Sequence, residues 1–453
     1  MQAALNEFVT AIPGATLTAD AAFTGVSTNS QTIEPGNLFV ALRGERFDAH
    51  DFLAEVATRG AAGVVAEHVP DGFTLPALIV PDTRHALGQI ARQWRQRFAI
   101  PVIGITGSNG KTTVKEMIAA ILVAEYGADN VLATRGNLNN EIGVPLTLFR
   151  LSAQHRAAAI EMGMNHPGEI ARLAEIAQPT VGLVNNAQRE HQEFMASVAA
   201  VAEENGAVIT ELGANACAVF PADDEFTPLW ISYAGTRRMM TFGLDADAAV
   251  TCQWKSLDFG SRLSVTAQGQ TFALTLSAAG VHNVRNALAA CAAALAIGIT
   301  PAAIVRGLEA FTPVAGRLQK KQSTHGATVI DDTYNANPDS VRAAIDVLAS
   351  APAPRTLVLG DMGEVGSEGV AFHEEIGAYA RAQQIEQLFT VGELARHASL
   401  AFGDHARHFD DMDTLNDEVA NVPPSASVLV KGSRFMKMER VVQRLTGAQA
   451  GGH

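Results

Sequence analysis

Residues 104–122, which read GITGSNGKTTVKEMIAAIL, combine glycines, hydroxyls and a lysine in the way that a phosphate-binding loop does. Glycines let a backbone approach a phosphate closely, a lysine neutralises β- and γ-phosphate oxygens, and a threonine hydroxyl can bind Mg²⁺. The usual P-loop has a glycine five positions before its Gly-Lys pair, whereas this chain has Ile105 there. The stretch could therefore bind a nucleotide or be only a glycine-rich turn.

The elements on either side of the loop favour the nucleotide. The apolar run at residues 100–106 predicts a buried strand. The residues after the loop predict a helix with Lys115 and Glu116 off its apolar face. That face consists of Val114, Met117, Ile118, Ile121 and Leu122. Strand, loop and helix in succession are the context that phosphate binding requires, so we predict an ATP site in which backbone N–H groups from Gly107 to Thr112 surround the phosphates. Its expected residues are Gly107, Ser108, Asn109, Gly110, Lys111, Thr112 and Thr113.

Two further strand-like runs lead to residues that could form part of a ligand site. Glu161 lies in the run at residues 157–163, just past the expected end of the strand, and His191 follows the run at 180–186. Ligands of open α/β sheets lie outside the carboxyl ends of the strands, so both side chains could reach one crevice, where Glu161 could bind Mg²⁺. A solvated loop acid and a surface histidine are the alternatives.

Asparagines are concentrated in two other stretches. Asn139 and Asn140 lie in RGNLNNEIGVP, which could be a turn or could bind a sugar-like or peptide ligand through its amides. Asn283 and Asn286 lie in GVHNVRNALAA, just before an alanine-rich run. They could recognise an adenine edge, or they could cap a helix.

Charged residues also follow strand-like runs in the last third of the chain. Asp331 and Asp332, in IDDTYNANPDS, could contact a ribose hydroxyl or a cation, or could form an Asx turn. Lys431 and Arg434, in LVKGSR, could bind a carboxylate, although exposed basic residues usually have no such role.

These stretches must be positioned by alternating strands and helices, so the predicted fold class is α/β. We expect a small α/β unit at residues 1–98, a largely parallel sheet at 99–315, and a doubly wound unit at 316–453. Residues 263–280 alternate with period two around a Gln-Gly turn, which predicts antiparallel hairpins appended to the second sheet.

Composition excludes several classes of protein. The formal net charge of −14 argues against binding to nucleic acid or to an anionic membrane surface. The longest bland run, residues 287–299, is too short to span a bilayer, and we expect no signal peptide and no membrane insertion. Three widely spaced cysteines suggest neither a disulfide framework nor a zinc site, so we expect a reducing cytoplasm.

Taken in order, the stretches resemble signatures of the Mur ligase family, the ATP-dependent amide-bond-forming enzymes of peptidoglycan synthesis. The similar stretches are TGSNGKTTVKEM, GNLNNEIGVPLTL, VNN followed by His191, GVHNVRNALAA, GRL at 316–318, DDTYNANPDS and VLVKGSR. The resemblance covers nearly the whole chain. It implies three domains: a UDP-muramoyl-binding domain, an ATPase, and a Rossmann-like domain that closes over ATP and the incoming amine.

The resemblance also implies roles for individual residues. Lys111, Glu161 and His191 would be catalytic, and Thr112, Glu161 and His191 would bind Mg²⁺. Asn283 and Asn286 would face adenine, and Arg317 and Asp332 would lie near the ribose and phosphates. The substrate would contact Ser30, Arg43, Gly44, Asp48, His50, Asn139, Asn140, Asn335, Lys431 and Arg434.

Within the family, FVALRGERFDAHDF and DDTYNANP are similar to the members that add D-alanyl-D-alanine to UDP-N-acetylmuramoyl-tripeptide. The implied reaction passes through an acyl phosphate, and the implied state is a monomer. A ligase for a single diamino acid, a folylpolyglutamate synthase and a non-catalytic nucleotide-binding scaffold are the competing hypotheses. The DDTYNANP stretch and the first block argue against the first two, and the retained Lys111, Thr112, Glu161 and His191 argue against the third.

One position departs from the family pattern. Many members carry a carbamylated lysine that helps hold a second Mg²⁺, and Asn205 stands in its place here. We therefore expect no carbamylated lysine. Either Glu203 or Glu204 supplies the negative charge, or substrate and water hold most of the second metal ion.

Overall fold

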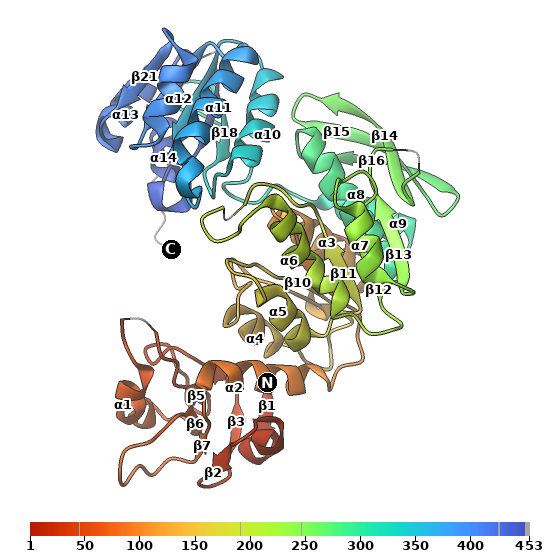
Figure 1. The fold of residues 1–453 in the computed structure, drawn as a ribbon, viewed down its shortest axis with the longest axis vertical. Helices are drawn as coiled ribbons and strands as arrows, with labels where there is room; N and C mark the ends of the chain where they lie inside the picture. The colour runs from red at the N-terminus through yellow and green to blue at the C-terminus, as the bar shows by residue number, and fades with distance from the viewer. Residues whose placement is uncertain (45, 191, 246, 425, 449–453) are drawn as a thin grey trace.

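The computed structural model describes residues 1–448 except residues 45, 191, 246 and 425, and it forms three α/β lobes in chain order (Figure 1). The first lobe (red to orange) and the third (blue) lie at opposite ends of the molecule, with the second lobe (yellow to green) between them. The predicted α/β class with three domains is confirmed, whereas the boundaries near residues 98 and 315 remain predictions. Among the described residues, no helix is long and apolar enough to cross a bilayer.

The first lobe is built on a sheet with the strand order β2-β7-β6-β5-β4. Strands β4 to β7 run parallel, and β2 is antiparallel to β7 at one edge. Strand β5 is fully buried, as its apolar sequence predicts. The elements are β1 (Gln2–Ala4), η1 (Leu5–Ala11), β2 (Thr16–Leu17), β3 (Ala22–Thr24), β4 (Val26–Ser27), β5 (Leu38–Val40), η2 (Ala49–Phe52), α1 (Leu53–Thr58), β6 (Gly63–Ala66), β7 (Ala77–Ile79) and α2 (Thr83–Arg95).

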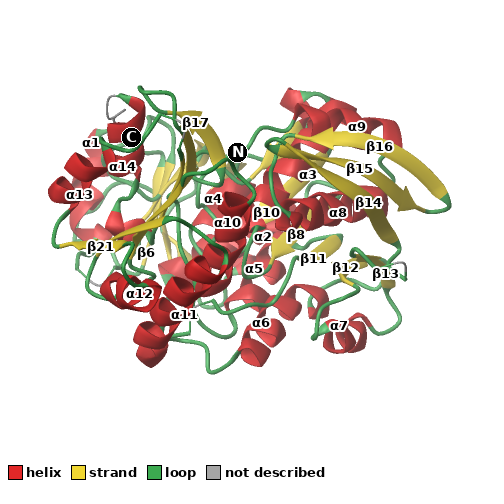
Figure 2. Ribbon diagram, turned by 90° about the horizontal axis from the view of Figure 1, so that it is seen from above, coloured by secondary structure: helices red, strands yellow, loops and turns green. Residues whose placement is uncertain are grey.

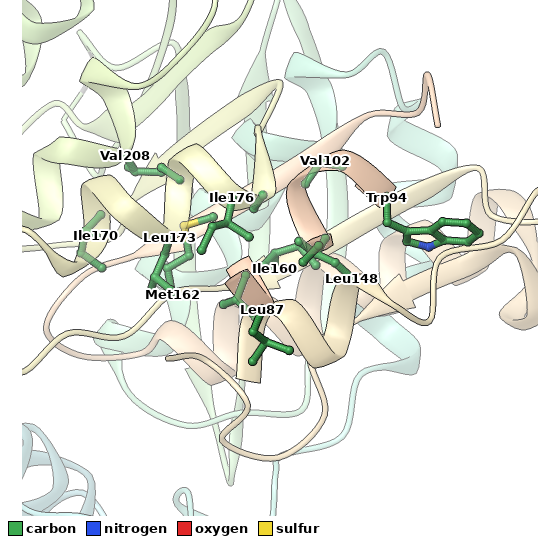
Figure 3. Packing of buried hydrophobic residues seen from close by; sticks show 14 of the residues in the cluster. Leu87, Trp94, Val102, Leu148, Ile160, Met162, Ile170, Leu173, Ile176 and Val208 are labelled. Carbon is green, nitrogen blue, oxygen red and sulfur yellow. The ribbon is translucent and has the colours of Figure 1, made fainter. Parts of the chain in front are cut away.

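Helix α2 joins the first lobe to the second through a shared hydrophobic core. Figure 3 shows Leu87 of α2 near Ile160 and Trp94 of α2 near Leu148, among other buried side chains of the second lobe. A Cβ atom at Gly88 would lie 2.8 Å from a methyl group of Ile176, so α2 and α5 approach one another more closely there than a larger residue would allow. Helix α2, which ends just before the predicted boundary at residue 98, therefore packs against both the first and the second lobe.

The second lobe contains the sheet that carries the phosphate loop, with the strand order β16-β15-β14-β13-β12-β11-β8-β10-β9. Strands β8 to β14 are parallel, and β14, β15 and β16 pair antiparallel, as predicted. The elements are β8 (Val102–Thr106), α3 (Lys111–Tyr126), η3 (Ala128–Asn130), β9 (Val131–Ala133), α4 (Gly143–Leu148), β10 (Ala157–Glu161), α5 (Glu169–Ala177), β11 (Val181–Val184), α6 (Val198–Thr210), β12 (Cys217–Pro221), α7 (Thr227–Ala234), β13 (Arg238–Phe242), β14 (Val250–Leu257), β15 (Gly260–Ala267), β16 (Gln270–Leu276), α8 (Val281–Ala296) and α9 (Pro301–Ala310).

Helix α3 follows the phosphate loop and packs against the sheet as well as against α8 and α9. The predicted apolar face is confirmed, because all five of its residues are fully buried. The expectation that Lys115 lies off the buried face is wrong: only 1 % of Lys115 is exposed, and its ammonium pairs with Glu116. Helix α3 has close neighbours beyond the sheet, since α9 lies so near that a Cβ at Gly307 would be 2.4 Å from the Cα of Ile121.

The antiparallel strands β14 to β16 extend beyond the parallel part of the sheet (Figure 2). The turn between β15 and β16 consists of Gln268 and Gly269, both with positive φ (50° and 74°). Two consecutive residues with positive φ are typical of a type I′ hairpin turn, so the predicted Gln-Gly turn is confirmed.

The third lobe has the strand order β17-β18-β22-β19-β20-β21, with β17 antiparallel at the edge and the other strands parallel. This is the doubly wound arrangement that the sequence predicts. The elements are β17 (Gln319–Gln322), β18 (Thr328–Asp332), α10 (Pro338–Ala349), β19 (Arg355–Gly360), η4 (Gly366–Glu368), α11 (Gly369–Ala382), β20 (Gln387–Val391), α12 (Ala395–Phe402), β21 (Ala406–Phe409), α13 (Met412–Val419), β22 (Ser427–Lys431), η5 (Arg434–Met436) and α14 (Glu439–Thr446).

Candidate active site

The loop between β8 and α3 has the backbone that its glycines predict. Gly107 and Gly110 have φ values of 129° and 82°, a region that other residues rarely adopt. A Cβ at Gly110 would lie 2.5 Å from Oδ1 of Asn286 and 2.8 Å from Nδ2 of Asn185. The loop is therefore enclosed by side chains from other elements, and glycine is required at this position for both conformation and space.

Amide side chains hold the first half of the loop. Asn205 accepts a hydrogen bond from the Gly107 N–H (2.8 Å), and Asn186 accepts one from the Asn109 N–H (2.9 Å) through its side chain. The Ser108 N–H donates to the Asn186 carbonyl (3.2 Å). The structure thus differs from the expectation that every N–H from Gly107 to Thr112 faces a phosphate, because the first three already have protein acceptors. Helix α3 begins at Lys111, and its N-terminal end supplies the remaining N–H groups of the loop.

A buried carboxylate lies beside the start of α3. Glu161 ends β10, which pairs with β8 so that Glu161 is opposite Ile105. Its Oε1 accepts hydrogen bonds from Thr112 Oγ1 (3.1 Å) and Asn139 Nδ2 (2.9 Å). Only 2 % of Glu161 is exposed, and among the described residues its Oε2 has no hydrogen-bond partner. Burying a carboxylate oxygen without a partner is costly, and a cation would offset that cost.

This arrangement fits Mg²⁺, since a carboxylate oxygen and a threonine hydroxyl are oxygen ligands of the kind that Mg²⁺ takes. His191, the other predicted metal ligand, lies outside the described residues.

The third lobe reaches this site through Arg317 and Asp332. Arg317 donates from Nη2 to Thr112 Oγ1 (2.9 Å), and its guanidinium carbon lies 4.1 Å from the centre of the Tyr334 ring. Asp332 accepts from the Leu318 N–H (3.1 Å) and from Lys431 Nζ (2.5 Å). Asp332 and Lys431 end neighbouring strands in register, so their side chains meet at one edge of the sheet.

One cavity of about 760 Å³ lies between the lobes and is lined by most of the predicted residues. These are Ser108, Asn109, Gly110, Lys111, Thr112, Thr113, Asn139, Asn140, Glu161, Asn283, Asn286, Arg317, Asp332, Asn335 and Lys431. The remaining described ones, Gly107, Ser30, Arg43, Gly44, Asp48, His50 and Arg434, do not line it.

The two asparagines of α8 contact protein groups. Asn286 Oδ1 accepts from Asn185 Nδ2 (2.9 Å), and Asn185 Nδ2 also donates to the Asn109 carbonyl (2.8 Å). Asn283 Nδ2 donates to the Ala279 carbonyl (2.8 Å). Asn286 therefore supports the phosphate loop, and contact of either residue with adenine stays a prediction.

The predicted residues of the first lobe form a separate cluster. Asp48 accepts from the His50 N–H (3.0 Å), from His50 Nδ1 (2.5 Å) and from Arg43 Nε (2.9 Å). These bonds, led by the one from the His50 backbone, hold the pKa of Asp48 well below its usual value. Gly44 lies in the same loop, and Ser30 lies between β4 and β5. Arg434 is 65 % exposed and pairs with Glu439, so it lies apart from both groups.

Asn205 occupies the position at which many family members carry the carbamylated lysine. Asn205 holds the Gly107 N–H, as described above. Glu204 accepts from the N–H groups of Gly168 and Ile170 (2.7 Å each) at the start of α5, and Glu203 is exposed. Neither glutamate lines the cavity, so the hypothesis that one of them supplies charge beside the phosphates has no support in this structure.

The acidic residue beside the phosphate loop is one that the sequence reasoning missed. Glu190 accepts a hydrogen bond from Lys111 Nζ (2.6 Å), and both side chains are largely shielded from water. Its neighbour Arg189 pairs with Asp339 and Glu375 of the third lobe (2.6 Å to each). Hydrogen bonding to Glu375 raises the pKa of Arg189. The one available signal was the charged pair directly before His191, in the segment that follows a predicted central strand.

Comparisons with known proteins agree with this organisation. Three family descriptions match successive parts of the chain: "Mur ligase family, catalytic domain" at residues 22–95, "Mur ligase middle domain" at 105–294, and "Mur ligase, glutamate ligase domain" at 316–434. The Escherichia coli protein named UDP-N-acetylmuramoyl-tripeptide–D-alanyl-D-alanine ligase is 41% identical over 447 residues, which is 96% of this chain and 95% of that protein.

Solved structures show the same similarity. The crystal structure of MurF from Acinetobacter baumannii superimposes with a TM-score of 0.92 at 33% identity, over 98% of this chain and 99% of that one. MurF ligase from Thermotoga maritima, solved in complex with ADP, gives a TM-score of 0.84 at 27% identity, over 93% and 96% of the two chains. The fold, the ordered motifs and the cavity that they line lead to one conclusion: the chain belongs to the Mur ligase family.

Proposed function

We propose that the chain is an ATP-dependent ligase that joins D-alanyl-D-alanine to UDP-N-acetylmuramoyl-tripeptide, giving ADP, phosphate and UDP-N-acetylmuramoyl-pentapeptide for peptidoglycan synthesis. The observation that carries the proposal is the 41% identity, across nearly the whole chain, to a protein of that name. The cavity adds a physical reason, because it brings a phosphate loop, a buried carboxylate and residues of the third lobe together.

The chemistry that such a cavity supports is activation of a carboxylate. A carboxylate is a poor electrophile with a poor leaving group, and phosphorylation corrects both faults. In the first step, an oxygen of the tripeptide's terminal carboxylate attacks the γ-phosphorus of ATP, and ADP leaves. In the second step, the amino group of D-alanyl-D-alanine attacks the acyl carbon. The tetrahedral intermediate then releases phosphate, and the nitrogen loses a proton to give the amide.

The residues around the loop would act mainly through charge and position. Lys111 would neutralise oxygens of the transferring phosphoryl group, and the N-terminus of α3 would face the same group. Thr112 and Glu161 would hold Mg²⁺, with His191 as a further predicted ligand. Bound Mg²⁺ would stabilise the charge that develops on the phosphate oxygens. Asn283 and Asn286 would lie toward adenine, and Arg317 and Asp332 toward the ribose and phosphates.

The substrates would lie across the three lobes, which we assign to residues 1–98, 99–315 and 316–453. The first lobe would bind the UDP-muramoyl end through Ser30, Arg43, Gly44, Asp48 and His50. From the cavity, Asn139 and Asn140 would contact the peptide carboxylate, and Asn335 and Lys431 would contact the incoming dipeptide. Arg434 lies outside the cavity, so its predicted contact with the dipeptide has no support from the cavity lining. Action as a monomer in the cytoplasm belongs to the same proposal.

A phosphate-release assay with single-component omissions tests the proposal. Full turnover is expected only with ATP, UDP-N-acetylmuramoyl-tripeptide and D-alanyl-D-alanine together. A second arm offers UDP-N-acetylmuramoyl-dipeptide with a diamino acid, and a third replaces the dipeptide by free D-alanine. Turnover in either of these arms at the full rate would contradict the proposed substrate, and no turnover in any arm would contradict a ligase function.

A further inference from the structure

The ammonium group of Lys111 is already hydrogen-bonded to the protein. It donates to the Gly107 carbonyl (2.6 Å), the Ser108 carbonyl (3.2 Å) and Glu190 Oε1 (2.6 Å). An ammonium group has three N–H donors and no acceptor. A phosphate oxygen can therefore bind Lys111 only if one of these contacts is given up.

Glu190 is the contact that a phosphate would replace. The two carbonyls belong to the phosphate loop itself, whereas Glu190 comes from the segment after β11. Glu190 also carries a negative charge, and the side chains of Lys111 and Glu190 are 15% and 9% exposed. Two anions that share one shielded cation repel each other strongly, since little water screens them.

The residue before Glu190 is bound to the third lobe. The Arg189 N–H donates to Asp339 Oδ2 (2.9 Å), and the guanidinium donates to Asp339 Oδ1 (2.6 Å) and Glu375 Oε2 (2.6 Å). The guanidinium carbon also lies 5.3 Å from the centre of the Phe372 ring. Because the backbone of Arg189 is itself hydrogen-bonded to Asp339, a displacement of Glu190 also strains the contact with the third lobe.

We propose that Glu190 and Arg189 are positioning residues that link ATP binding to the position of the third lobe. Glu190 is the counter-ion of Lys111 until the phosphates displace it, and Arg189 passes that displacement to Asp339 and Glu375. The inference rests on the proposed use of ATP but concerns the coupling between lobes. By reciprocity, the contacts of Arg189 with the third lobe must then influence the affinity for nucleotide.

Isothermal titration of the full chain with a non-hydrolysable ATP analogue and Mg²⁺ tests the link. Glu190→Gln keeps the shape of the side chain but removes the competing charge, so the Kd is expected to fall about tenfold or more. Arg189→Met keeps the aliphatic stem beside Phe372 and the backbone bond to Asp339, but it removes the guanidinium bonds to Asp339 and Glu375. It is expected to lower the Kd about threefold or more in the wild-type background. In the Glu190→Gln background, Arg189→Met is expected to change the Kd by less than twofold, because the link is already broken.

Asp258→Asn is the matched control. It removes the ion pair between Asp258 and Lys320 (2.9 Å), which also joins the second lobe to the third but does not involve residues 189 and 190. Its Kd is expected to equal that of the wild type. The proposal is overturned if Glu190→Gln binds the analogue equally or more weakly, or if Arg189→Met has the same effect in both backgrounds. Failure of the wild-type chain to bind the analogue would instead contradict the proposed function.

Discussion

Replacing Glu161 by glutamine separates a role in catalysis from a role in folding. The amide keeps one oxygen to accept from Thr112 and Asn139, and it removes the charge from a side chain that is only 2 % exposed. Among the described residues, Glu161 Oε2 has no hydrogen-bond partner, so replacing this oxygen by the amide nitrogen breaks no hydrogen bond. The new NH₂ group has no described acceptor, which lowers stability, while loss of the unpaired buried charge raises it. Because these two effects oppose each other, we expect the free energy of unfolding without ligands to change by less than about 1 kcal/mol.

Catalysis should respond very differently. Loss of one positioned electrostatic group in an enzyme typically lowers kcat by about 10²–10³, which corresponds to about 2.7–4 kcal/mol of transition-state stabilisation. Glu161→Gln is expected to lower phosphate release by this factor at saturating substrates. Adding more Mg²⁺ should recover only part of the loss, because the missing charge belongs to the protein.

The assay compares steady-state phosphate release with urea unfolding of the same preparations. Glu125→Gln, an exposed carboxylate-to-amide change on α3, serves as the control and should leave both quantities unchanged. Activity of Glu161→Gln within threefold of the wild type would refute the reasoning. Unfolding at a markedly lower urea concentration would also refute it, since a structural role would then explain the lost activity.

Three further predictions concern the loop and the third lobe. Gly110→Ala places a Cβ at a φ of 82° and in contact with neighbouring amides, and steady-state kinetics should show the KM for ATP raised about tenfold or more. Asn205→Ala removes the acceptor of the buried Gly107 N–H, so urea unfolding should show a loss of about 1–3 kcal/mol. Burial lowers the pKa of His373, whose Nε2 accepts from the Met362 N–H, so the folded state binds fewer protons than the unfolded state as pH falls below about 6.5. The free energy of unfolding of the third lobe should therefore fall from pH 7 to pH 5 by up to about 1.4 kcal/mol per pH unit. Chemical denaturation of His373→Gln should show a smaller fall over the same pH range.

The local elements could be predicted because short-range patterns determine them. The spacing of Val114, Met117, Ile118 and Ile121 was sufficient to predict the buried face of α3. The meeting of the phosphate loop and Glu161 could also be predicted, because carboxyl ends of parallel strands lie at one edge of a sheet. The register between β8 and β10 brings the two together as expected.

Features that depend on distant packing could not be predicted. Lys115 is buried although it lies off the apolar face, and the packing of α8 and α9 against α3 is not indicated by any periodicity within α3. The contact of Lys111 with Glu190 requires the strand order, which places β11 directly beside β8. The sequence shows Asn205 where many family members carry a lysine, but the hydrogen bond from the Gly107 N–H to Asn205 depends on where α6 packs.

The position of the third lobe is likewise a property of the three-dimensional structure. Asn109 and Asn337 exchange hydrogen bonds across the cavity, with Asn337 Nδ2 donating to Asn109 Oδ1 (2.9 Å). Each residue alone is consistent with a loop or a helix cap, and Asn337 does cap α10. Only the assembled lobes show that such residues face one another.

Isotope transfer tests the central claim, activation of a substrate carboxylate by ATP, most directly. The tripeptide substrate is labelled with ¹⁸O in both oxygens of its terminal carboxylate and is converted with ATP and D-alanyl-D-alanine. The account predicts that one ¹⁸O atom appears in the released phosphate, that ADP carries none, and that the amide product keeps the other. Released phosphate without ¹⁸O, formed together with the pentapeptide product, would contradict the account.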